Sequence, residues 1–169
     1  MKSSGFTLVE LVLMLTVLIA AALGVWLILN PLELKKRLND SIRLSDLAIL
    51  QQAVNNSISE ATISGRVILC PIQTMNCKGS TSDSDANKLK SDGSGWVKAD
   101  LSTQKSINIP TLPIDPVNNG EFNYRFYSDG KAWEIDTVLE SSFYRQRMVG
   151  DGGNNDSRYE VGTNLTLIN

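Results

Sequence analysis

The residues best placed to do chemistry lie at the start of the chain, where a carboxylate stands at the edge of an apolar segment. Glu10 follows Gly5-Phe6-Thr7-Leu8-Val9, and no charged residue comes after it until Glu33. Insertion scales put the cost of a carboxylate at the centre of a membrane-spanning helix at about 3 kcal/mol, with less near an end. Glu10 is therefore expected either to reach the lipid headgroups or to pair with a positive group.

Elsewhere the composition argues against an enzyme. The chain has no histidine, which removes Ser-His-Asp and Cys-His catalysis and the commonest metal ligand. Its two cysteines, Cys70 and Cys77, cannot build a structural zinc site alone, because such a site takes four ligands. The oxygen-rich stretch 83–87 lacks the glycine and the final glutamate of a calcium loop, so we interpret it as a solvated loop.

The element that must position Glu10 is the apolar run Leu11–Leu29. As a helix this run is roughly 30 Å long, the thickness of the hydrocarbon core of a bilayer. A cleavable secretory signal peptide is the alternative, because Ala20-Ala21-Ala22 could act as a cleavage site. The apolar region of such peptides is normally only about 7–15 residues long, however. We therefore predict a membrane-spanning helix over residues 6–30.

The residues around Glu10 also carry a family resemblance. Met1–Gly5 is a short polar leader with one basic residue, and Gly5-Phe6-Thr7-Leu8-Val9-Glu10 resembles the signature of type IV pilins and type II secretion pseudopilins. The resemblance implies that prepilin peptidase cuts between Gly5 and Phe6, that Phe6 is then N-methylated, and that Glu10 is the assembly residue. Glu10 would neutralise the amino terminus of a neighbouring subunit; within one chain it could also pair with Phe6, four residues away.

The resemblance further implies a structural function, as a subunit of a type IV pilus or pilus-like filament. The expected partners are copies of the chain, prepilin peptidase/methyltransferase, an inner-membrane assembly platform, and membrane lipid before assembly. The precursor is expected in the bacterial inner membrane and the filament at the cell surface. Two alternatives stay open: a bitopic, signal-anchored protein with an extracytoplasmic binding domain, or a pseudopilin of a secretion or DNA-uptake system. Adhesion and motility are equally compatible. A net charge of −2 gives no indication of nucleic-acid binding.

Charges on the two sides of the span conflict with this orientation. Four basic residues follow the span: Lys35, Lys36, Arg37 and Arg43. Only Lys2 precedes it, so the positive-inside rule alone places the domain in the cytoplasm. We give precedence to the leader motif, since the peptidase acts on a cytoplasmic leader. Glu33 and Asp40 suggest charge pairs between packed helices in a filament.

Beyond the span we predict that the helix kinks at Pro31, with Gly24 as a second weak point. It then continues to Ser64, where Gly65 is suited to a C-cap. Its second half carries an apolar stripe at helical spacing: Leu47, Leu50, Val54, Ile58 and Ala61. Such a stripe needs a partner surface, which a sheet formed by the rest of the chain can supply.

The remaining residues predict that sheet. Alternating residues 122–127 and 132–138 flank Asp129-Gly130, the signal of a tight hairpin. Short closing strands are expected at 159–162 and 165–168. Trp96, Trp133 and the hairpin tyrosines are expected in the core, with an exposed adhesive surface as the alternative. The segment Leu112-Pro113-Ile114-Asp115-Pro116 is a second, weaker match to the pseudopilins.

We thus predict an α+β, type IV pilin-like fold, with a long kinked N-terminal helix packed on a small antiparallel sheet. The expected divisions are a leader (1–5), a transmembrane or filament-core helix (6–30), the second half of the helix (31–64), and a β-rich domain (65–169) with a polar loop at 71–106. In an exported domain Cys70 and Cys77 would form a disulfide. The pseudopilin resemblance also implies a calcium ion near the C-terminus, for which Asp151 and Asp156 are the available residues. We assign no metal site to them.

Overall fold

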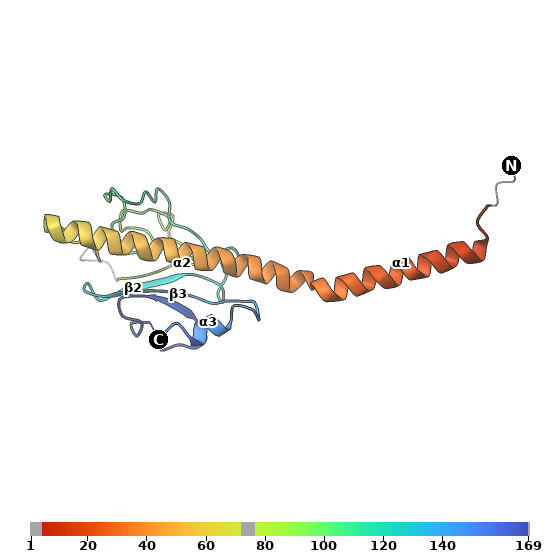
Figure 1. Ribbon diagram of the computed structural model, residues 1–169. Helices are drawn as coiled ribbons and strands as arrows, with labels where there is room; N and C mark the ends of the chain where they lie inside the picture. Colours follow the sequence, from red (N-terminus) through yellow and green to blue (C-terminus); the bar gives the residue numbers. More distant parts are fainter. Residues whose placement is uncertain (1–4, 72–76, 169) are drawn as a thin grey trace. The chain divides into compact units, whose positions relative to one another are not determined.

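The computed structural model describes residues 5–71 and 77–168, with the backbone alone for residues 27–29 and Ser64. Its elements are, in chain order, α1 (Leu8–Leu29), α2 (Pro31–Ser64), β1 (Lys78–Ser80), β2 (Arg125–Ser128), β3 (Trp133–Thr137), α3 (Gln146–Val149) and β4 (Tyr159–Gly162) (Figure 1). The chain forms two compact units, Met1–Lys36 and Arg37–Asn169. The predicted combination of a long apolar N-terminal helix and a small antiparallel sheet is confirmed.

The sheet of the second unit has the strand order β1-β2-β3-β4, and each neighbouring pair is antiparallel. The predicted hairpin joins β2 to β3. In its turn the Asp129 carboxylate accepts hydrogen bonds from the backbone N–H groups of Lys131 (2.8 Å) and Ala132 (2.7 Å), and Gly130 adopts a φ of +87°. The strand β4 has the predicted bounds. The strand predicted at 165–168 is wrong, because the N–H groups of Leu167 and Ile168 donate to the Glu134 side chain and not to a strand ladder.

The core lies between α2 and the sheet, which run side by side in Figure 1. The predicted stripe of α2 faces it: Leu47, Leu50 and Val54 are fully buried. Opposite them the aromatic residues Trp96, Tyr124 and Trp133 are also buried, in the same cluster. The prediction of a core position is confirmed for these three residues. It is wrong for the other hairpin tyrosine, Tyr127, which is half-buried on the opposite face of β2 with Lys78 over its ring.

Part of the predicted polar loop belongs to this core. Residues 71–106 contain β1, which pairs with β2, and a buried run that includes Trp96, Val97, Ala99 and Leu101. The backbone of β1 passes so close to this run that a Cβ on Gly79 would lie 2.2 Å from the carbonyl oxygen of Trp96. The many Ser, Asp and Gly residues predicted a loop here, because the strand β1 forms through pairing with the distant β2 and not from local propensity.

Candidate functional site

The first turn of α1 places Glu10. Thr7 is the N-cap of the helix, and its Oγ1 accepts a hydrogen bond from the Glu10 N–H at 3.3 Å. In return Glu10 Oε2 accepts from the Thr7 N–H at 3.0 Å and from Thr7 Oγ1 at 3.1 Å. This is a capping box, which satisfies backbone donors that a helix start leaves unpaired. The spacing Thr7-x-x-Glu10 is the sequence signature of this motif, a signal that was available at positions 7 and 10 but was not used in the prediction for Glu10.

The capping box changes the expected environment of Glu10. Within the described chain its carboxylate is engaged by Thr7 and not by Phe6, which precedes the helix with its side chain 73% exposed. While Gly5 is attached, the nitrogen of Phe6 is a peptide amide that carries no charge. Gly5, at the expected cleavage position, also lies outside the helix. The bond proposed for cleavage thus lies in the non-helical segment just before a self-capped helix.

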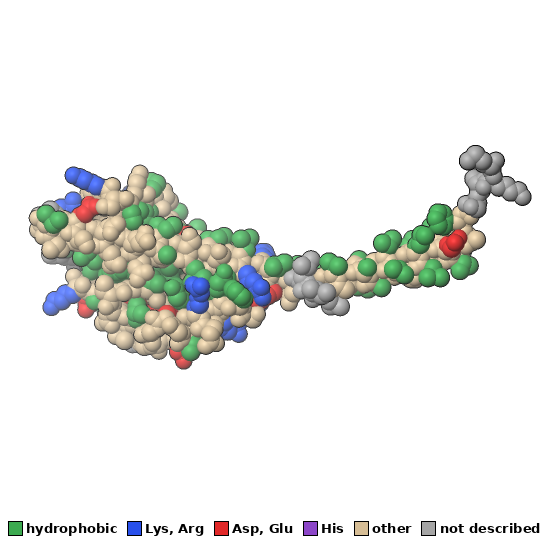
Figure 2. Space-filling view, viewed as in Figure 1, with side chains coloured by type: hydrophobic (Ala, Val, Ile, Leu, Met, Phe, Trp, Pro, Cys, Tyr) green, Lys and Arg blue, Asp and Glu red, His purple; other side chains and the backbone are tan. Residues whose placement is uncertain are grey.

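The helix α1 presents apolar side chains on all sides. Its 22 residues correspond to about 33 Å, and every large apolar side chain from Leu8 to Trp26 is more than half exposed. Figure 2 shows these hydrophobic side chains along its length. Within the described part of the chain, one helix is long and apolar enough to cross a membrane, and it contains this segment. A helix that is apolar all round requires burial in lipid or among other helices.

The helical run is interrupted at Asn30, next to Pro31. Asn30 adopts the left-handed conformation (φ 38°, ψ 76°), which asparagine tolerates better than most residues. Its N–H donates to the Trp26 carbonyl (3.3 Å) and closes α1, while its Oδ1 accepts from the Glu33 N–H (3.3 Å) and caps α2. Pro31 is then the first residue of α2, a position where its missing N–H costs nothing. At Gly24, the other predicted weak point, α1 continues without a break.

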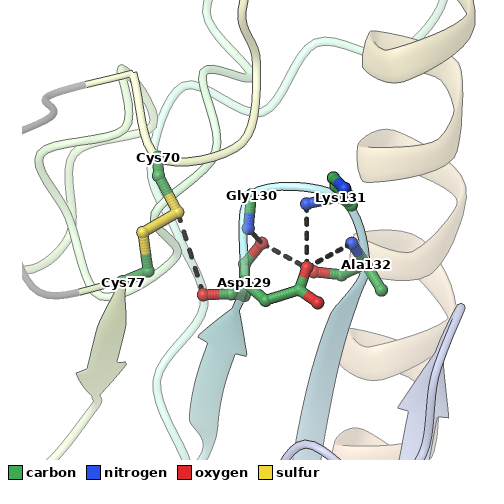
Figure 3. The surroundings of a disulfide bond; sticks show 7 residues. Cys70, Cys77, Asp129, Gly130, Lys131 and Ala132 are labelled. Carbon is green, nitrogen blue, oxygen red and sulfur yellow. Dashed lines mark hydrogen bonds between the residues drawn. A yellow bond between two sulfur atoms is a disulfide. The ribbon is translucent and has the colours of Figure 1, made fainter.

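The two cysteines form a disulfide, Cys70–Cys77. It lies beside the turn between β2 and β3, with Cys70 Sγ 4.0 Å from the Ser128 carbonyl oxygen (Figure 3). The carbonyl of Cys77 accepts from the Ser128 N–H at 3.0 Å, which extends the β1–β2 ladder by one bond. In the chain-entropy model, closing a loop of this size stabilises the fold by about 2–3 kcal/mol.

Comparison with known proteins gives no relatives: no family model, curated protein or solved structure matches this chain. The function proposed below therefore depends on the residues and geometry of the chain itself.

A buried charge cluster attaches α2 to the folded domain. We call it the Arg43 cluster; its members are Asp40, Arg43, Asp115 and Glu140. Arg43 donates through Nε and Nη2 to the two carboxylate oxygens of Asp115 (2.6 and 3.0 Å). Its Nη1 donates to Asp40 Oδ1 (2.9 Å) and Glu140 Oε1 (2.6 Å). The side chains of Arg43, Asp40 and Asp115 are completely buried.

The electrostatics of the cluster favour the charged forms. Burial lowers the pKa of Arg43, but hydrogen bonds to Asp115, Glu140 and Asp40 outweigh it and raise this pKa above its ordinary value. Burial also disfavours the charged form of Asp115 and so raises its pKa. Hydrogen bonds from Arg43 and from two backbone N–H groups outweigh this effect and bring the pKa of Asp115 below its ordinary value. Each ion is thus stabilised in the fold only while its partner is present.

This cluster corrects two interpretations of the sequence. Asp40 was expected to pair with another subunit, yet its Oδ2 accepts from the N–H (2.8 Å) and hydroxyl (2.6 Å) of Ser141 within the same chain. Arg43 was counted as a flanking charge of the span, yet it is a core residue. A signal was available: Asp40 and Arg43 continue the stripe of Leu47 and Leu50 at the same helical spacing.

The opposite face of the sheet carries a second charged layer. Asp136, fully buried, is paired with Arg125 and Arg158. The Glu134 and Glu160 carboxyl groups lie on the same face; burial first, and then the neighbouring Glu134 carboxyl group, raise the pKa of Glu160 to about 7. The Oε2 atom of Glu134 accepts from the N–H groups of Leu167 (2.7 Å) and Ile168 (3.0 Å), which holds the C-terminal segment on the sheet.

The residues considered for calcium lie beside this layer. Both oxygens of Asp151 accept backbone hydrogen bonds, from Gly153 (2.9 Å) and Glu160 (2.8 Å), and Asp156 is exposed. Among the residues that the structure describes, no group of three or more acidic or cysteine side chains is arranged to hold a metal ion.

Proposed function

We propose that this chain is a structural subunit of a type IV pilus or pilus-like filament. Prepilin peptidase cleaves it after Gly5 and methylates Phe6. The helix α1 anchors the subunit in the bacterial inner membrane, and an assembly platform then moves it into a helical bundle of the same helices. The exported domain is carried on the outside of the filament. The role is structural and not catalytic.

The observation that carries the proposal is the exposed, uncharged apolar surface of α1 behind a single carboxylate. Lipid covers such a surface in the membrane, and neighbouring α1 helices cover it equally well in a filament. Glu10 is the one charged group at its start, between Phe6 and the uncharged run. Cleavage creates a positive amine on Phe6, and in a low-dielectric bundle this amine and a carboxylate stabilise one another.

The capping box gives Glu10 a suitable partner before assembly. While the subunit is alone in the membrane, the N–H and hydroxyl of Thr7 solvate the carboxylate. During assembly the carboxylate exchanges these bonds for an ion pair with the amine of an incoming neighbour. Only a residue that is already partnered near the headgroups can stay charged there at low cost.

The first test is the intact mass of the protein recovered from sheared cell-surface material. A chain that begins at N-methylated Phe6 in that fraction supports processing and filament assembly together. A chain that retains residues 1–5 and occurs in membranes alone contradicts the proposal and favours the bitopic anchored protein.

The second test separates the charge of Glu10 from its capping role. Glu10→Gln keeps a side chain that can accept in the capping box but removes the negative charge, whereas Glu10→Ala removes both. Both variants are expected to insert into the membrane and to yield few or no filaments. Glu121→Ala, which removes an exposed carboxylate of the folded domain, is the matched control. Normal filaments from Glu10→Gln would show that the charge does not drive assembly.

A further inference from the structure

One surface of the folded domain combines an exposed phenylalanine ring and a half-buried tyrosine ring with exposed arginines. We call it the basic-aromatic patch; its members are Arg37, Phe143, Tyr144, Arg145 and Arg147. The Arg37 guanidinium carbon lies 4.7 Å from the centre of the Phe143 ring, and that of Arg147 lies 5.4 Å from the Tyr144 ring. The two rings meet edge to face at 4.8 Å. Even so, Phe143 remains 61% exposed, so arginine covers only part of its surface.

The segment 141–148, which displays all of these residues except Arg37 of α2, is fixed at both ends. Ser141, at its start, is buried and bonded through its N–H and hydroxyl to Asp40 of α2. Met148, at its end, is buried, and its sulfur accepts from the Leu139 N–H at 3.3 Å. The residues between them are therefore held outward by the fold. In Figure 2, Lys and Arg side chains lie beside hydrophobic ones at one end of the folded domain. This is the end at which the domain's part of α2 begins.

The position of Arg37 in the chain limits where this surface can be. Arg37 follows Leu29, the last residue of α1, by eight residues, which as an extended chain span at most about 28 Å and as helix about 12 Å. If α1 spans a bilayer, the patch is therefore tethered close to the bilayer surface. Lys35 and Lys36 add two further positive charges in the same segment.

We propose that the basic-aromatic patch binds the anionic lipid headgroups of the membrane in which α1 is anchored. This inference rests on the membrane-anchored state in the proposed function, and it does not require filaments. Phe143 and Tyr144 enter the interfacial region, where amphipathic and aromatic side chains are stable. The arginines Arg37, Arg145 and Arg147 pair with lipid phosphates, for which the guanidinium geometry is suited. The contact holds the domain of an unassembled subunit on the membrane surface.

Lipid is favoured over a protein or nucleic-acid partner because the chain itself brings the patch to a lipid surface. The rest of the molecule does not share its charge: the whole chain carries −2, while the patch and its two neighbouring lysines carry five of its 16 positive groups. Each arginine near an anionic surface contributes about fivefold to binding, so three together contribute about 100-fold.

The test uses the full chain reconstituted in nanodiscs, either of phosphatidylcholine alone or with 30% phosphatidylglycerol. Hydrogen exchange of the peptide covering residues 141–150 is followed by mass spectrometry. We expect exchange to slow in the anionic discs and this slowing to disappear in 0.5 M salt. The triple variant Arg37→Gln, Arg145→Gln, Arg147→Gln loses the slowing, and Phe143→Ser weakens it. The matched control removes three exposed lysines elsewhere, Lys90→Gln, Lys105→Gln and Lys131→Gln, and keeps it.

Four results would overturn the inference, each in a different way. Equal exchange in both kinds of disc shows that lipid charge has no effect. Slowing that depends on the number of chains per disc, and not on lipid, assigns the patch to a neighbouring subunit. Slowing caused by added single-stranded DNA in uncharged discs, and not by phosphatidylglycerol, assigns it to nucleic acid. Failure of the chain to enter discs at all refutes membrane anchoring, and with it the proposed function, whereas the first three results leave that function intact.

Discussion

Replacing Arg43 with methionine tests whether the Arg43 cluster attaches α2 to the domain. The change keeps most of the side-chain volume but removes every hydrogen bond that the Arg43 guanidinium donates to Asp40, Asp115 and Glu140. Three carboxylates then remain together, two of them completely buried, without a cation. Removing one partner of a buried pair typically costs about 3–5 kcal/mol of unfolding free energy, and we expect Arg43→Met to fall in that range at pH 7.

The loss of unfolding free energy in Arg43→Met should become smaller as the pH falls. In the natural chain the pKa of Asp115 is lowered, so its contribution to stability is present above the unfolded value of 3.8 and is lost only as the pH falls below it. In Arg43→Met, Asp115 loses the cation that lowers its pKa, while burial still raises that pKa. Asp115 then binds a proton more readily in the folded state than in the unfolded state, and the variant therefore recovers stability as the pH falls from 7 towards 5.

The assay is unfolding of the full chain in detergent micelles, followed by near-ultraviolet circular dichroism from the buried residues Trp96 and Trp133. Arg43→Lys keeps the charge but not the fork of donors, so it should show an intermediate loss. Arg66→Met is the control, because Arg66 is 46% exposed and 3.9 Å from Asp100, a pair worth less than about 1 kcal/mol. A loss of under about 1 kcal/mol for Arg43→Met at every pH from 5 to 8 would refute the reasoning.

Two further changes test other parts of the chain. Glu160→Gln removes a carboxyl group whose pKa is raised from its ordinary 4.5 to about 7. That carboxyl group stabilises the fold below pH 4.5 and loses this effect as the pH rises through 7. The unfolding free energy of the variant should therefore exceed that of the natural chain by about 1–2 kcal/mol above pH 7, after allowance for solvent screening. Melting temperatures at pH 5 and 8 measure this, and an unchanged pH profile would contradict it. Thr7→Val removes the cap of α1, worth about 1 kcal/mol; the Glu10 amide should then exchange about fivefold faster in micelles, whereas Thr7→Ser should leave it unchanged.

The sequence predicted the elements whose signals are local. The hairpin around Asp129-Gly130, the end of α2 at Ser64 before Gly65 (φ +70°), and β4 at 159–162 all appear in the structure. Each depends on turn or capping chemistry, or on alternation within a few residues. The buried stripe from Leu47 is equally local, because 3.6-residue periodicity alone selects its face.

The missed features depend on contacts between distant segments. The Arg43 cluster joins residues up to 100 positions apart, and nothing near Asp115 indicates which cation it meets. β1 pairs with the distant β2 and passes close to Trp96 at Gly79, and the segment 165–168 is held by Glu134 and not by a ladder. In these cases tertiary contacts decided the local structure, and propensity had little influence.

The double cap at Asn30 has a consequence for how unwinding spreads along the N-terminal helices. Asn30 closes α1 with its N–H and starts α2 with its side-chain oxygen, so each helix is complete without hydrogen bonds from the other. Helix melting is cooperative because each turn supports the next, and a junction at which both ends are already satisfied interrupts that support. A pull that unravels the last turns of α1 therefore stops at Asn30 and leaves α2, with the domain attached through Arg43, fully wound.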